Sequence, residues 1–186
     1  MTAKDEPEMI THDEITEMIR NATQSVFSMM LGIDLESCDS FVEEDPPGPS
    51  EGVLALIGLA GTWAGSGTFS CSAEMARKIS SALLMAEYES INDEVLDAIG
   101  EVTNMVLGNV KTSLEEKLGP MGLSIPTVVY GRNFTTRSMA KASWSVVPFK
   151  LGGETIKVHL CLAPSRETPK IKSAGEHGRA FLTLMQ

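Results

Sequence analysis

The segment from Asn92 to Gly119 predicts a long amphipathic helix, which limits the possible folds more than any other feature of the chain. A helix turns about 100° per residue, so apolar residues spaced three and four apart fall on one face. Five aliphatic residues share that face: Ile99, Val102, Val106, Val110 and Leu114. Asn92 can cap the helix start, and Gly119-Pro120 ends it. The rest of the chain must supply an apolar layer against which this face packs.

Two shorter helices are predicted before this one. The first spans residues 13–31, with Gly32 as its end and with Met30 on its apolar stripe. The second spans residues 73–85 and can be capped by Ser72. The methionines of both segments are interpreted as adaptable core packing rather than as a binding surface: Met18, Met29, Met30 and Met85.

Six segments carry the residue types and turn signals of β-strands: 38–44, 53–61, 67–72, 124–130, 143–150 and 154–163. The glycines in and beside 62–66 and at Gly152-Gly153 permit tight reversals, which makes two pairs of these strands into hairpins. Helices and hairpins alternate without the regular order of parallel βαβ units. We therefore expect an α+β fold with a largely antiparallel sheet.

Length and charge limit the number of domains and the kinds of partner to be expected. We expect a disordered lead over residues 1–11, one domain over 12–165 and a C-terminal tail over 166–186. The net charge of −10 argues against nucleic acid and against an anionic membrane as partners, because neither attracts an acidic surface. The longest apolar run, 53–60, is too short for a bilayer, which needs about 20 residues, and no signal peptide is visible. A cytoplasmic location is therefore expected.

The polar face of the long helix is unusual. Taking Asp97 as the reference, Glu101, Asn104 and Gly108 fall within roughly 60° of one another, opposite the core face. Gly100 lies at the border of this ridge, and a glycine inside a helix costs about 1 kcal/mol relative to alanine. Bare backbone there suggests that another molecule approaches closely. An ordinary solvated face is the alternative, and the sequence favours neither strongly.

The ridge suits one kind of chemistry better than others. An asparagine does not titrate near neutrality, but it can orient a water, as a glutamine does in GTP hydrolysis. The ridge has no histidine and no third acid, so no metal site is predicted there. Cys38, Cys71 and Cys161 form no CxxC pair, so they predict neither a disulfide framework nor a metal site. The ridge therefore fits hydrolysis by an oriented water, with a partner that supplies the electrophile and the metal.

The order D-x-x-x-E-x-x-N in "DAIGEVTNMVLGN" resembles the active helix of the CheC/CheX/FliY family of chemotaxis phosphatases, and most closely its CheX-like members. "GLAGTWAGSGTFSCSAEMARKISSALL" resembles the hairpin and helix that precede it in the family, and "SIPTVVYG" resembles a later strand. The resemblance covers about residues 13–164. It implies a pseudo-symmetric fold with long helices packed on one face of the sheet, and a homodimer.

The resemblance also implies an activity and roles for single residues. The substrate would be the phospho-aspartate of a CheY-like response regulator, which brings its own Mg²⁺, so the chain needs no cofactor of its own. Asn104 would orient the attacking water, Glu101 would pair with the regulator's active-site lysine, and Asp97 would add a supporting contact. The remaining candidates for contact with the regulator are Gly100, Gly108 and Lys111.

Some family members carry a second active helix near the N-terminus. Here the corresponding positions are Asp13, Glu17 and Arg20, and Asn21 comes one residue too late, about 100° around the helix. A second site is therefore predicted to be absent. Two rival functions remain: a non-catalytic module that docks a regulator or a flagellar switch component, and a structural subunit whose acidic ridge meets a basic surface.

Overall fold

The computed structural model describes residues 10–44, 50–134 and 143–165. Within them, all strand pairs run antiparallel, in the order β1-β7-β8-β4-β3-β5, with β2 also on β7 and β6 also on β3. The strands are β1 (Glu36–Ser37), β2 (Phe41–Glu43), β3 (Ser50–Gly61), β4 (Trp63–Cys71), β5 (Met121–Leu123), β6 (Thr127–Phe134), β7 (Trp144–Leu151) and β8 (Glu154–Pro164).

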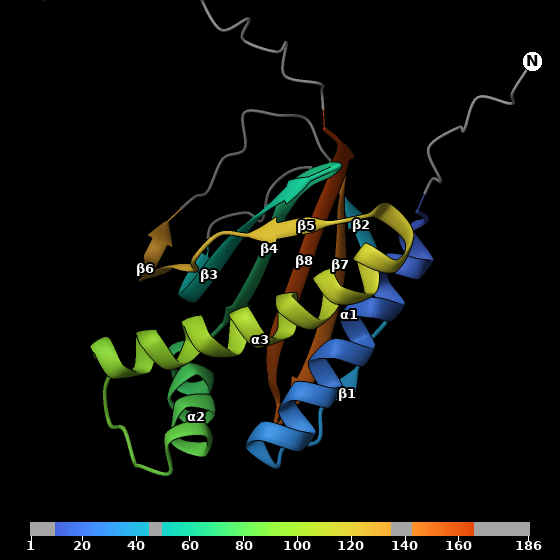
Figure 1. Cartoon of the computed structure of the whole chain (residues 1–186). Helices are drawn as coiled ribbons and strands as arrows, with labels where there is room; N and C mark the ends of the chain where they lie inside the picture. The colour runs from blue at the N-terminus through green and yellow to red at the C-terminus, as the bar shows by residue number, and fades with distance from the viewer. Residues whose placement is uncertain (1–9, 45–49, 135–142, 166–186) are drawn as a thin grey trace, which may run out of the picture.

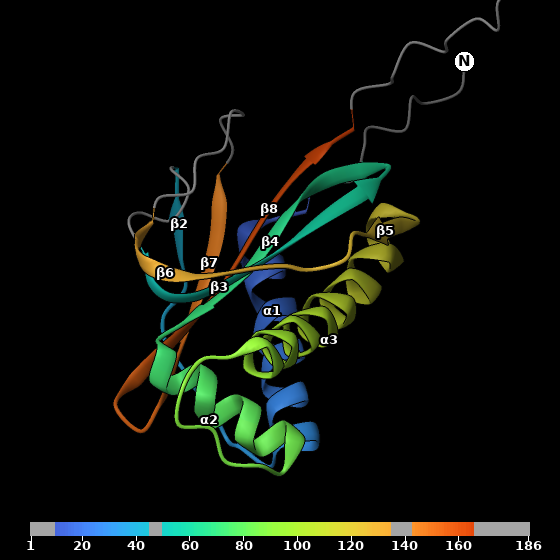
Figure 2. The same ribbon diagram turned by 90° about the vertical axis from the view of Figure 1, so that its left-hand side faces the viewer.

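The helices cover one face of this sheet, as Figures 1 and 2 show from two sides. They are α1 (His12–Val26), which continues as the π-helix η1 (Phe27–Leu31), then α2 (Ala73–Leu84) and α3 (Asp93–Leu118). The predicted α+β class, the antiparallel sheet and the helices on one face are confirmed.

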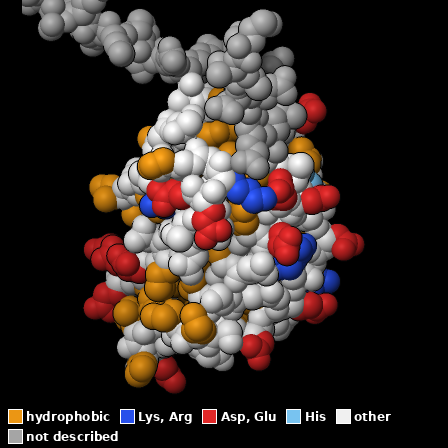
Figure 3. Space-filling view, turned by 45° about the vertical axis from the view of Figure 1, so that its right-hand side comes forward, with side chains coloured by type: hydrophobic (Ala, Val, Ile, Leu, Met, Phe, Trp, Pro, Cys, Tyr) orange, Lys and Arg blue, Asp and Glu red, His pale blue; other side chains and the backbone are white. Residues whose placement is uncertain are grey.

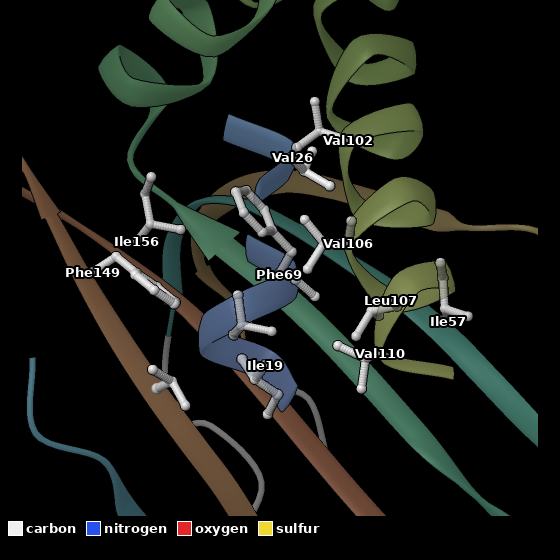
Figure 4. Packing of buried hydrophobic residues seen from close by; sticks show 14 of the residues in the cluster. Ile19, Val26, Ile57, Phe69, Val102, Val106, Leu107, Val110, Phe149 and Ile156 are labelled. Atoms are coloured by element: carbon white, nitrogen blue, oxygen red, sulfur yellow. The ribbon is translucent and has the colours of Figure 1, made fainter. Parts of the chain in front are cut away.

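The main core lies between the helices and this face of the sheet. Phe69 of β4 is fully buried, stacks on Phe27 with ring centroids 6.2 Å apart, and lies among Val26 and Val106 in Figure 4. Along the central strands alternate residues point into this core, as expected for strands with one covered face. The predicted core face of α3 is confirmed, because its five aliphatic residues are all fully buried.

A glycine on β4 sets how closely α3 approaches the sheet. A Cβ on Gly67 would lie 2.6 Å from Cδ1 of Leu107, so any larger residue would force that leucine to move. Leu107 is buried on α3, three residues after Asn104. The contact therefore fixes the helix against the sheet near the predicted ridge.

Helix ends follow the predicted signals. Asn92 Oδ1 accepts a hydrogen bond from Val95 N at 3.0 Å, and Ser72 Oγ accepts one from Met75 N at 3.1 Å. Thr11 and Glu14 form a reciprocal capping box at the start of α1, and Glu14 also pairs with Lys117 at the far end of α3. The hydrogen bonds from Lys117 and Thr11 lower the pKa of the Glu14 carboxyl to about 2.

The interpretation of three methionines as core residues is wrong. A π-turn takes one more residue than an α-turn, so from Phe27 onward the side-chain register shifts. Leu31 consequently takes the buried position, while Met29 and Met30 are exposed. Met85 caps the end of α2 in the left-handed conformation, with φ 54°, and its side chain is exposed.

Other differences concern strands and tails. The reversal predicted over 62–66 is tighter, since β4 already begins at Trp63. Of the strand predicted over 38–44 only Phe41–Glu43 forms a strand, β2, and the two-residue strand β1 before it was not predicted. The short strand β5 was not predicted, because three residues after Gly119-Pro120 are too few to show a pattern. The predicted tail at 166–186 and most of the lead at 1–11 lie outside the described residues. No helix among the described residues is long and apolar enough to cross a membrane.

One buried histidine predicts a pH dependence of stability. His159 lies on the sheet face opposite the helices, with Nδ1 3.2 Å from Thr68 Oγ1 and Nε2 3.8 Å from Glu43 Oε2. Burial, helped by the charge of Lys157, lowers the pKa of His159 from 6.5 to about 4. Between these values the unfolded chain binds a proton that the folded protein does not, so stability falls as the pH is lowered from about 6.5.

The test is thermal unfolding at pH 7 and pH 5 of the wild type and of His159→Gln. We expect a smaller drop in the melting temperature for the variant, because it lacks the titrating group. An equal drop in both proteins would assign the pH dependence to other residues.

Candidate functional site

The ridge predicted on the long helix is exposed on α3. Asp97, Glu101 and Asn104 are exposed, whereas Val102 and Val106 of the same helix are fully buried. α3 is anchored by its buried face, and the ridge points away from the sheet. The carboxylate of Glu101 and the amide of Asn104 are therefore presented together, one turn of a fixed helix apart.

The two glycines differ, and one interpretation needs correction. A Cβ on Gly108 would find no atom within 4 Å, so Gly108 leaves open space on the ridge, as predicted. Gly100 is buried instead, where a Cβ would lie 3.5 Å from Cγ2 of Val128 and 3.8 Å from Cβ of Pro126. Pro126 and Val128, at the start of β6, thus cover this glycine, so Gly100 does not form part of the open ridge.

This packing creates a hollow beside the ridge. The hollow has a volume of about 490 Å³. It is lined by Asp93, Leu96, Asp97, Gly100, Glu101, Pro126 and Val128. Ile125, next to Pro126, exposes 87% of its surface. The position of residues 125–128 beside the ridge was not predicted. Helical periodicity gives no information about a strand that folds back beside the helix.

Lys111 forms an ion pair within α3. Its Nζ lies 2.8 Å from Glu115 Oε2, and both side chains are about a quarter exposed. Glu115 Oε1 also accepts a hydrogen bond from Met121 N, and the hydrogen bond from Lys111 is the main cause that lowers the pKa of Glu115. Glu115 thus connects α3 to β5, and Lys111 pairs with this carboxylate from within the helix. A contact of Lys111 with a partner stays a prediction.

The corresponding part of α1 is arranged differently. Arg20 Nε donates to Ser37 Oγ at 2.8 Å, so the guanidinium connects α1 to β1. Asn21 lines a second hollow of about 440 Å³ between α1 and α3, together with Glu17 and Asn109. The arrangement on α1 therefore does not reproduce the Glu101–Asn104 pair.

The side chains of the ridge can position a water or a docked molecule. Among the described residues no three His, Cys, Asp or Glu side chains group as metal ligands. An exposed amide and carboxylate can hold a water and a cation of a docked molecule, but they offer no electrophile. A reaction at the ridge would therefore take place on a molecule that docks there.

Comparisons with known proteins each give a family or a protein described as CheX. The family profile described as "Chemotaxis phosphatase CheX" matches residues 53–150, which include the whole ridge on α3. A curated relative, the CheY-P phosphatase CheX of Thermotoga maritima, is 36% identical over 87 residues, which are 46% of this chain and 56% of that protein. This match thus spans little more than half of the curated relative.

Solved structures extend the likeness over most of the fold. The chemotaxis protein CheX of Vibrio vulnificus is 26% identical, with a TM-score of 0.72 that covers 81% of this chain and 99% of that one. CheX in the CheX–CheY–BeF₃–Mg²⁺ complex of Borrelia burgdorferi is 27% identical, with a TM-score of 0.69 over 80% of this chain and 97% of that one.

Proposed function

Because this chain belongs to the chemotaxis phosphatase CheX family, we propose that it hydrolyses the phospho-aspartate of a CheY-like response regulator. The observation that carries the proposal is the pair Glu101 and Asn104, exposed and uncovered on the outward face of α3 within the region that matches the family. The relative from Borrelia burgdorferi was solved together with CheY, BeF₃ and Mg²⁺, which supports a partner of this class.

In the proposed reaction Asn104 holds a water in line with the phosphorus of the regulator. The water oxygen forms a bond to phosphorus, the bond from phosphorus to the aspartyl oxygen breaks, and the products are inorganic phosphate and a free carboxylate. An amide is sufficient for this role, because the reaction of an acyl phosphate with water depends on geometry more than on a strong base. The regulator's own Mg²⁺ neutralises the charge on the phosphoryl oxygens.

Glu101 fixes the position of the regulator by pairing with its active-site lysine. The distance along the helix matches the task, since residues three apart lie on the same side and reach one docked surface. Asp97, one turn earlier, adds a second carboxylate on the same side, next to the hollow. The homodimer and the cytoplasmic location stay predictions.

The test is the release of phosphate from a phosphorylated CheY-like regulator of the same organism, with Mg²⁺ present. Release that is accelerated in proportion to the concentration of this protein supports the phosphatase. The rival docking module predicts a different result: binding to the phosphorylated regulator without any acceleration. Binding is measured separately with the beryllofluoride-loaded regulator, so the two functions give different results.

Gly108 offers a steric test of the docking surface. We expect Gly108→Leu to weaken binding of the regulator by at least tenfold, because the new side chain occupies the open space on the ridge, while the fold is kept. Gly108→Ala is the matched control. It adds one methyl group and is expected to raise the stability of α3 by about 0.5–1 kcal/mol. Equal binding by the two variants would place the regulator elsewhere.

A further inference from the structure

Four large apolar side chains are exposed where η1 and α2 end. Their exposed fractions are 75% for Met29, 54% for Met30, 46% for Leu84 and 94% for Met85. η1 and α2 contact each other, and their ends lie close together in Figures 1 and 2; we call these four residues the methionine patch. Figure 3 shows hydrophobic side chains gathered at this lower end of the molecule.

Two irregularities of the backbone place this patch on the surface. The π-turn at η1 turns Met29 and Met30 outward while Leu31 enters the core. Met85 occupies the left-handed position at the end of α2, where glycine or asparagine is usual. Its exposed side chain gains no packing in return for the strained conformation. Uncompensated strain of this kind is typical of positions kept for contact with another molecule.

The elements that carry the patch lie close to the first half of α3, which carries the ridge. In Figure 1, α2 lies below the first half of α3, with the end of α1 beside it, and Figure 2 shows α2 ending on the side where α3 lies. The segment between α2 and α3 carries two exposed carboxylates, Glu87 and Glu89, and Asp93 at the start of α3 is also exposed. Exposed carboxylates thus follow the patch along the chain, up to the helix that carries the ridge.

The size of the patch distinguishes between occupants. A stable interface contains about 20–30 residues on each side, far more than four side chains, so the patch alone cannot hold a homodimer together. It is large enough to extend an interface that begins elsewhere. Flexible, polarisable methionines suit such a role, because they adapt to the shape of a partner.

We propose that the methionine patch is the apolar part of the surface that docks the phosphorylated response regulator. The partner chemistry is an apolar helical face of the regulator bordered by basic residues, which would meet the patch and the neighbouring carboxylates. The inference rests on the proposed function for the identity of the regulator. It adds that affinity depends on residues of η1 and α2 as well as on α3, whereas turnover depends on α3 alone.

The test uses the full chain with the double variant Met29→Gln/Met85→Gln, which keeps side-chain length and removes apolar character. We expect the Kd for the beryllofluoride-loaded regulator and the KM for the phosphorylated regulator to rise roughly tenfold, with kcat within about twofold. Val42→Thr is the matched control, since Val42 is 49% exposed on β2, away from the patch. It is expected to leave both constants unchanged.

Met85→Gly separates docking from folding. Glycine adopts the left-handed conformation readily, so this variant is expected to melt at an equal or higher temperature and still bind more weakly. Unchanged Kd and KM in both patch variants would overturn the inference while the phosphatase stands. A changed oligomeric state with unchanged KM would assign the patch to self-association and also overturn it. Binding by the wild type that depends on the patch but gives no phosphate release would overturn the phosphatase alone.

Discussion

Replacement of Asn104 by alanine is expected to lower the rate of phosphate release by on the order of 10²–10³-fold, the loss typical of removing one positioned hydrogen-bonding group. The side chain is exposed and makes no contact on which the core depends, so folding is expected to be unchanged. The affinity for the beryllofluoride-loaded regulator is expected to stay within about twofold, because little contact area is lost. Single-turnover phosphate release and a binding titration measure the two effects separately.

Two further variants make this result specific. Asn109→Ala makes the same chemical change on the same helix, at an exposed position that lines the hollow toward α1, and should leave turnover unchanged. Glu101→Ala should weaken both binding and turnover, since it removes the ion pair with the regulator's lysine. Retained turnover in Asn104→Ala would exclude the oriented-water mechanism even for a member of this family.

Replacement of Phe69 by alanine is expected to lower the free energy of unfolding by about 3–5 kcal/mol. Phe69 is fully buried between β4 and the helices and stacks on Phe27, so its loss leaves a cavity that the rigid sheet cannot close. Unfolding in urea, followed by circular dichroism, measures the change.

Phe41→Ala is the matched control for this prediction. Phe41 is 38% exposed on the short strand β2, so the same truncation there should cost much less. A loss at Phe69 no greater than that at Phe41 would contradict the assignment of Phe69 to the centre of the core.

The sequence predicts the helix α3 and its two faces well, because capping residues and a helical repeat over 26 residues reinforce each other. Asn92 caps the helix, and the ridge is exposed as expected. The hollow beside the ridge could not be predicted from the sequence. Its wall at Pro126 and Val128 comes from a segment that hydrogen-bonds to β3 through Ser124, and contacts of this kind depend on the tertiary fold.

The errors at the methionines have a local cause. An amphipathic pattern assumes one constant twist, and at Phe27 the twist changes to that of a π-turn. Nothing in the composition of the five residues distinguishes Met30 from Leu31 as the inward residue. The left-handed cap at Met85 was equally hidden, since glycine is the residue that usually marks such a position.

The π-turn determines how the exposed end of this helix can change by mutation. One additional residue within a single turn is what an insertion of one amino acid into an α-helix produces, with the residues on either side kept in place. Removal of Met29 or Met30 from η1 would return the segment to an α-helical turn and leave Phe27 and Leu31 in the core. One exposed methionine of η1 can therefore be gained or lost in a single mutational step, which leaves the sheet and α3 unaltered.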